Sequence, residues 1–187
     1  MPKMIGYQEQ VIGLILLGEA TASSSSTLEF DIPAGYASIE WHFYNCHPAT
    51  DNVNLEFQVN AAGESGFNES MTSTFIAAYL NESGIGGNLL YETGFDQGNG
   101  TGYQHIGSYV GYENDESCSG VLTLYDPSST TYVKHFTTRI NILTQNGYER
   151  DVHAAGYINT TTAIDEISFK FSSGNIDAGT IRMYGVK

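Results

Sequence analysis

The feature that most constrains the fold is a repeated alternation of apolar and polar residues with a period of two. Residues 38–44 place Ile39, Trp41 and Phe43 on one side and polar side chains on the other. Because successive side chains of a β-strand point to opposite faces, this pattern is typical of a strand with one face in the core. The pattern recurs at residues 27–32, 54–60, 167–171 and 180–184. These segments predict half-buried strands.

Weaker strand candidates occupy much of the remaining chain. They lie at residues 11–17, 89–93, 104–112, 121–125, 132–143 and 152–158. Residues 70–80 are compatible with a helix or a strand, because their β-branched and aromatic content weakens the helical interpretation. Turn-forming residues separate the runs. About ten or eleven short strands of this kind predict an all-β fold, an antiparallel, jelly-roll-like β-sandwich with long loops.

The sequence predicts one domain over residues 1–187. A chain of 187 residues can bury enough surface to need no disulfide or metal for stability. Residues 1–26 are expected to hold an N-terminal strand and a Ser-rich loop, and residues 61–115 a loop-rich region suited to binding. The apolar run at 11–17 imitates a short signal peptide, but we expect an uncleaved, buried strand. It is too short to span a membrane.

The charge of the chain bears on its partners. It has 21 acidic and 7 basic residues, for a formal net charge of −14. This field repels a phosphate backbone and an anionic bilayer alike. We therefore expect neither nucleic acid nor membrane as a partner.

No set of residues stands out as catalytic, cofactor-binding or metal-ligating. The five histidines lack the spacing that places two of them on one zinc ion. Grouped carboxylates such as Glu113 and Glu116 are interpreted as surface charge, and no nucleophile motif accompanies them. Calcium binding by residues 96–102 stays open, although glycines stand where ligands are needed. Cys46 and Cys118 are expected to be free thiols, with one bridge as the alternative.

Tyrosine is the most informative excess in the composition. The chain has 13 tyrosines, and a tyrosine buries a large apolar ring while its hydroxyl remains hydrogen-bonded. Such residues suit subunit interfaces and sugar stacking equally well. The candidate interface or glycan contacts are Tyr103, Tyr109, Tyr112, Tyr125 and Tyr132.

The segment from residue 167 to residue 185 resembles the closing hairpin of a family of β-sandwich virion proteins of tailed bacteriophages. The shared pattern is a strand, S-G-N-I, two residues, G-T, and a strand ending in Y-G. Gly174 and Gly179 are expected to take positive φ, Ile176 to enter the core, and Gly185 to end the last strand. Residues 23–30 and 41–55 agree more loosely. Residues 61–160 match no family pattern.

This resemblance implies a non-enzymatic structural protein, located in the virion and made in the cytoplasm of the host bacterium. The expected partners are copies of itself, as a trimer, and other virion proteins such as the major capsid or tail protein. Capsid decoration is preferred, and no cofactor is implied. The alternative is a tail-fibre or receptor-binding module that recognises a host surface glycan through residues 61–115. A glycan-depolymerising hydrolase is the third hypothesis.

Overall fold

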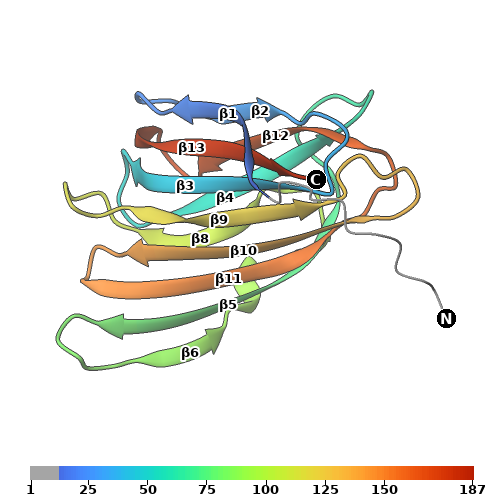
Figure 1. Ribbon diagram of the computed structural model, residues 1–187. Helices are drawn as coiled ribbons and strands as arrows, with labels where there is room; N and C mark the ends of the chain where they lie inside the picture. The colour runs from blue at the N-terminus through green and yellow to red at the C-terminus, as the bar shows by residue number, and fades with distance from the viewer. Residues whose placement is uncertain (1–12) are drawn as a thin grey trace.

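The fold consists of two antiparallel β-sheets that form a sandwich (Figure 1). The computed structural model describes residues 13–187, which form thirteen strands and one short 3-10 helix, η1 (Thr93–Phe95). The strands are β1 (Ile15–Thr21), β2 (Leu28–Asp31), β3 (Ser38–Pro48), β4 (Val53–Ala61), β5 (Met71–Asn81), β6 (Asn88–Tyr91), β7 (Gly98–Gly100), β8 (Gln104–Val110), β9 (Cys118–Tyr125), β10 (Lys134–Leu143), β11 (Tyr148–Ile158), β12 (Ile164–Phe171) and β13 (Ile176–Val186).

The two sheets differ in size. The large sheet has the order β1-β13-β3-β9-β10-β11-β5-β6, with β7 paired beside β5, and the small sheet has the order β2-β12-β4-β8. The consecutive strands β2, β3, β4 and β5 alternate between the two sheets, as in a jelly roll. The last two strands, β12 and β13, lie inside the small and the large sheet respectively.

Aromatic side chains from both sheets meet in the core. Phe169 of β12 is fully buried and packs edge-on against Phe30, Trp41 and Phe43, at ring-centroid distances of 6.2, 6.0 and 5.1 Å. Trp41 and Phe43 belong to the large sheet, whereas Phe30 and Phe169 belong to the small one. The alternating residues of the sequence therefore join the two layers around Phe169.

The predicted all-β sandwich is confirmed. All five segments with clear alternation lie in strands β2, β3, β4, β12 and β13, and their apolar rows are buried. The six weaker candidates also overlap strands, namely β1, β6, β8, β9, β10 and β11. Residues 11 and 12 of the first candidate lie outside the described residues.

Residues 70–80, which are compatible with a helix or a strand in the sequence, form the strand β5, in which Met71, Phe75 and Ala77 face the core. Residues 61–115 hold β5, β6, β7 and β8 with loops between them. Two finer expectations are wrong. The strands number thirteen instead of ten or eleven. The N-terminal strand is not buried: Ile15 and Leu16 are exposed, because β1 is an edge strand that pairs only with β13 among the described residues.

The closing hairpin follows its predicted chemistry with one exception. Gly174 and Gly179 have φ angles of +70° and +114°, and Ile176 is fully buried. Gly185 does not end the last strand, since β13 continues to Val186. It is needed instead for packing, because a Cβ atom there would lie 2.3 Å from the ring of Tyr36.

Candidate functional site

The five tyrosines singled out in the sequence do not form one cluster. Tyr103 is half-buried under Lys170, and its hydroxyl donates to Ser168 at 3.2 Å. Tyr112, Tyr125 and Tyr132 are exposed on separate segments. Tyr109 differs from these because it lines a cavity together with residues of β5 and β11. Of the five tyrosines, Tyr109 is therefore the strongest candidate for a binding residue.

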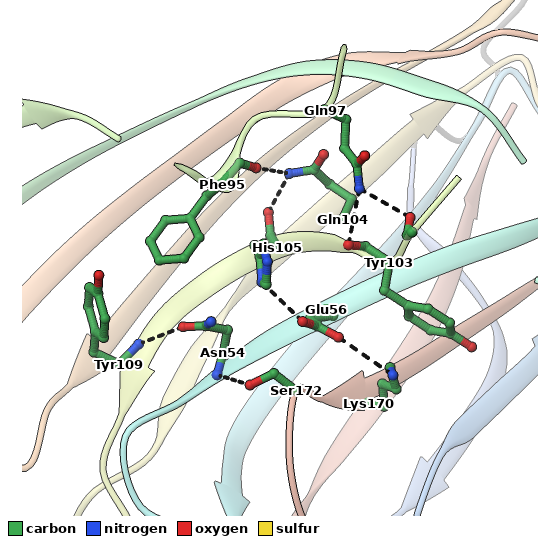
Figure 2. A network of polar contacts seen from close by, with 11 residues as sticks. Asn54, Glu56, Phe95, Gln97, Tyr103, Gln104, His105, Tyr109, Lys170 and Ser172 are labelled. Atoms are coloured by element: carbon green, nitrogen blue, oxygen red, sulfur yellow. Dashed lines mark hydrogen bonds and ion pairs between the residues drawn. The ribbon is translucent and has the colours of Figure 1, made fainter. Parts of the chain in front are cut away.

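Tyr109 is held in an unusual backbone conformation at the end of β8. Its φ angle is +60°, which is uncommon for a bulky residue. The backbone N–H of Tyr109 donates to the Asn54 side-chain oxygen at 3.1 Å, and the Asn54 N–H donates to Ser172 Oγ at 3.0 Å (Figure 2). The ring of Phe95 packs edge-on against Tyr109 at 5.7 Å. The hydrogen bond therefore fixes the backbone of Tyr109, and Phe95 restrains its ring.

Arg150 lines the cavity and is itself buried. It is only 7% exposed and lies on β11 directly opposite Tyr79 of β5. Its guanidinium lies over the rings of Tyr109 and Tyr79, at 4.9 and 5.7 Å from their centroids. One Nη atom forms an ion pair with Glu92, whereas Nε has no hydrogen-bond partner among the described residues. The arginine thus retains an unused donor.

The cavity has a volume of about 370 Å³ and draws on both sheets. Tyr79 and Arg150 continue the core-facing rows of β5 and β11, whereas Tyr109 belongs to the small sheet. Tyr148 packs edge-on against Tyr79 at 5.7 Å. The remaining lining residues are Asn52, Thr144, Gln145 and Asn146. This Tyr109 cavity therefore combines aromatic rings, amides, a hydroxyl and a guanidinium, and none of its lining residues is acidic.

A row of ionisable side chains crosses the small sheet near Phe95 and Tyr109. Glu56 of β4 lies opposite His105 of β8 and Lys170 of β12. One Glu56 oxygen is 3.1 Å from His105 Nδ1 and the other is 3.8 Å from Lys170 Nζ (Figure 2). Gln104 donates to the carbonyl oxygens of Phe95 and His105, which ties η1 to β8. Gln104 therefore holds η1 next to β8, and with it Phe95, whose ring contacts Tyr109.

The two cysteines do not form a reactive site. Cys46 and Cys118 are buried, unbridged neighbours on β3 and β9. Burial raises the pKa of the Cys46 thiol to about 12. Burial and the neighbouring Cys46 raise the pKa of Cys118 well above its ordinary value. Both side chains therefore stay protonated at neutral pH, and a thiolate nucleophile is not available.

Two exposed apolar surfaces lie at opposite edges of the large sheet. The β6 edge consists of Ile76, Leu80, Ile85, Leu89 and Tyr91, all of them exposed. Tyr91 and Ile76 are cross-strand partners, so they lie on one face. The β1 edge consists of Leu14, Ile15 and Leu16. Residues 83–91 and 13–18 contain no charged residue, although the chain is strongly acidic.

Sequence reasoning missed the partners of Tyr109. Tyr79 lies in the segment with an ambiguous helix or strand interpretation, and only the strand places it on the face of Phe75 and Ala77. Arg150 precedes the predicted strand at 152–158, although it continues the alternation of Val152 and Ala154. Continuing the period-two alternation by one further position in each segment identifies Tyr79 and Arg150 as core-facing residues. It does not predict that the two residues contact each other.

Within residues 13–187, no group of three or more His, Cys, Asp or Glu side chains is arranged to hold a metal ion. The one helical segment in this part of the chain, η1, is far too short to cross a membrane. A comparison with models of known protein families finds no match, and a comparison with curated proteins finds no related sequence.

Proposed function

We propose that this chain is a non-enzymatic structural protein of a tailed-phage virion, displayed on the outside of the particle as a homo-oligomer. The closing hairpin and the β-sandwich support this proposal through the family resemblance. The net charge of −14 is also compatible with the outer surface and disfavours contact with packaged DNA. Capsid decoration is preferred to a tail position because residues 13–187 contain no fibrous shaft.

The observation that carries the proposal is the pair of uncharged, apolar edges. Soluble proteins usually protect edge strands with charges or proline, since unpaired backbone groups can join another sheet. The β6 edge instead exposes Leu89 to 67% and Tyr91 to 57% of their surfaces. Contact between copies at these edges buries apolar area where like-charge repulsion is smallest. A second copy of the same chain is therefore the favoured partner.

The two edges also permit a closed ring. If β6 of one copy contacts β1 of the next, the interface is heterologous, and repeated contacts of this kind form a cyclic oligomer when the rotation between copies closes and an open filament when it does not. A trimer is the expected order. Contact of β6 with β6 would produce an isologous dimer instead.

Light scattering coupled to gel filtration tests this arrangement on the full chain. We expect a trimer for the wild type and monomers for Leu89→Glu and for Leu16→Glu. Leu89→Glu keeps an intact β1 edge, and Leu16→Glu keeps an intact β6 edge. When the two variants are mixed, these two edges can still contact each other, so we expect a heterodimer. Tyr132→Glu introduces the same charge at an exposed residue away from both edges and should remain trimeric. A monomeric wild type, or no heterodimer in the mixture, contradicts the arrangement.

The location in the virion requires a separate experiment. An antibody against the chain is applied to intact particles of the phage that encodes it, and bound antibody is located by electron microscopy. We expect labelling over the capsid. Labelling of the tail supports the virion proposal but overturns the preference for capsid decoration. Particles that lack the chain, even after disruption and immunoblotting, overturn the proposal as a whole.

A further inference from the structure

We infer that the Tyr109 cavity is a binding site for a neutral saccharide of one or two rings. This function goes beyond the structural role proposed above. It does not depend on oligomer formation, because no residue that lines the cavity belongs to either apolar edge. A volume of about 370 Å³ lies at the small end of the range for ligand-binding cavities. The size therefore suits a short glycan segment better than an extended polymer.

The aromatic residues supply the apolar part of sugar recognition. Tyr79, Tyr109 and Tyr148 line one cavity, and the Tyr109 ring is 37% exposed. Pyranose rings present faces of C–H groups, and aromatic rings bury such faces while a phenolic hydroxyl remains available for hydrogen bonds. Phe95 supports Tyr109 from outside the cavity. The ring is thus positioned before a ligand arrives.

The polar residues match the hydroxyl groups of a sugar. Each sugar hydroxyl is both a donor and an acceptor, and each amide side chain offers both functions as well. Asn52, Gln145 and Asn146 bring three amides to the lining of the cavity. The amide nitrogen of Gln145 donates to the Asp51 carboxylate, so Gln145 offers a ligand its oxygen. The Thr144 hydroxyl accepts from the Tyr148 N–H at 3.2 Å, which leaves its own proton free to donate. The Nε donor of Arg150 has no partner among the described residues, but it is buried and does not belong to this polar surface.

The charges favour a neutral ligand over an acidic one. The single positive charge of the lining, on Arg150, is already paired with Glu92. The chain as a whole has a net charge of −14, which repels anionic glycans at long range. A second hollow on the surface is lined by Asp115, Glu116 and Asp177, so it lacks this balance of charges. The Tyr109 cavity is therefore the site best suited to neutral hydroxyl-rich ligands.

The backbone at Tyr109 supports this assignment. A bulky non-glycine residue with a left-handed backbone is strained, and such residues cluster at ligand-binding sites. Here the hydrogen bond to Asn54 maintains that conformation and aims the ring at the cavity. A rigid, preformed ring reduces the entropy that a ligand must lose on binding.

The test uses the full chain and defined sugars as probes. Lactose, maltose, cellobiose and α-mannobiose represent neutral disaccharides, and 3′-sialyllactose is the acidic counterpart of lactose. Saturation-transfer NMR detects binding, and titration calorimetry of the bound probe gives its Kd. We expect at least one neutral probe to bind, and sialylation of lactose not to improve binding.

Two variants locate the site. Tyr109→Ala and Asn146→Ala are each expected to weaken binding at least tenfold, whereas Tyr132→Ala, at an exposed tyrosine outside the cavity, leaves Kd unchanged. Thermal unfolding verifies that each variant is folded. Asn146→Ala is the variant that should disturb the fold least, because Asn146 is exposed on a turn. The inference is overturned if no neutral probe binds, if 3′-sialyllactose binds more tightly than lactose, or if both variants retain full affinity.

The same proteins separate this inference from the proposed oligomer. Tyr109→Ala should keep the wild-type mass in light scattering, and Leu89→Glu should keep the wild-type Kd for the sugar. A wild-type protein that is monomeric but binds a neutral probe contradicts only the edge arrangement. A wild-type protein that forms the oligomer but binds no neutral probe contradicts only the saccharide site.

Discussion

Replacement of Phe169 by alanine should remove a large part of the stability of the sandwich. Phe169 is fully buried, and its ring contacts Phe30 of its own sheet and Trp41 and Phe43 of the other. Truncating a buried phenylalanine costs about 3 to 5 kcal/mol, and each edge-to-face pair contributes about 0.5 to 1.5 kcal/mol beyond area burial. Since three such pairs are lost, we expect the upper part of that range, about 4 to 5 kcal/mol.

Urea unfolding followed by tryptophan fluorescence measures this loss directly. Trp41 is the single tryptophan of the chain and lies 6.0 Å from Phe169, so its emission reports on the same core. Domains of this size are stable by about 5 to 15 kcal/mol. If the alanine variant does not fold, Phe169→Leu is used instead; it loses the same three ring pairs but leaves a smaller cavity, so its expected loss is smaller than that of the alanine variant. Tyr132→Ala is the surface control and should change stability by no more than about 0.5 kcal/mol. A loss below about 2 kcal/mol for Phe169→Ala refutes the central role of this ring.

Three further measurements test the structure elsewhere. Gly120→Ala places a Cβ atom 2.1 Å from the Arg139 carbonyl oxygen and should destabilise the protein by about 1 to 3 kcal/mol; Gly98→Ala, with open space around it, is the control, and equal stability of the two variants contradicts the packing. The Cys46 thiol, with its pKa raised to about 12 by burial, should react with a thiol reagent at pH 8 only after unfolding, and rapid labelling of the native protein contradicts its burial. The hydrogen bond from Arg139 lowers the pKa of Asp151. The ionised Asp151 therefore stabilises the fold above its ordinary pKa of about 4, and this effect is lost as pH falls through the lower pKa of the folded state. The free energy of unfolding of Asp151→Asn should depend less on pH in this acidic range than that of the wild type, and the same pH dependence for both proteins contradicts the ion pair.

The strands could be predicted from the sequence because their pattern is local. In β4 and in β3 up to Phe43, large apolar residues such as Trp41 and Phe57 occupy every second position, so a short window suffices to assign each strand. The segment of β5 is compatible with a helix or a strand, and only its β-branched and aromatic content favours the strand. Its apolar row is also interrupted by Ser73, which is buried and donates a hydrogen bond to Gln104. β7, with glycine at both ends, carries no apolar pattern at all. Its place beside β5 depends on tertiary contacts alone.

The cavity was harder to predict because its residues meet only after distant strands pair. Tyr109 was chosen for its residue type, but its backbone strain and its hydrogen bond to Asn54 are consequences of the folded structure. Tyr79 and Arg150 become neighbours through the pairing of β5 with β11. A single sequence does not specify that pairing, since any strand with a suitable face could fill the place.

The positions of β12 and β13 have a consequence for synthesis of the protein on the ribosome. β2 pairs only with β12, and β1 only with β13, among the strands of residues 13–187. Both early strands therefore lack a partner until residues 164–187 have been translated. Neither sheet can be completed while the nascent chain is still growing towards this point, and a ribosome that stalls before it leaves apolar strand faces open to chaperones or to aggregation.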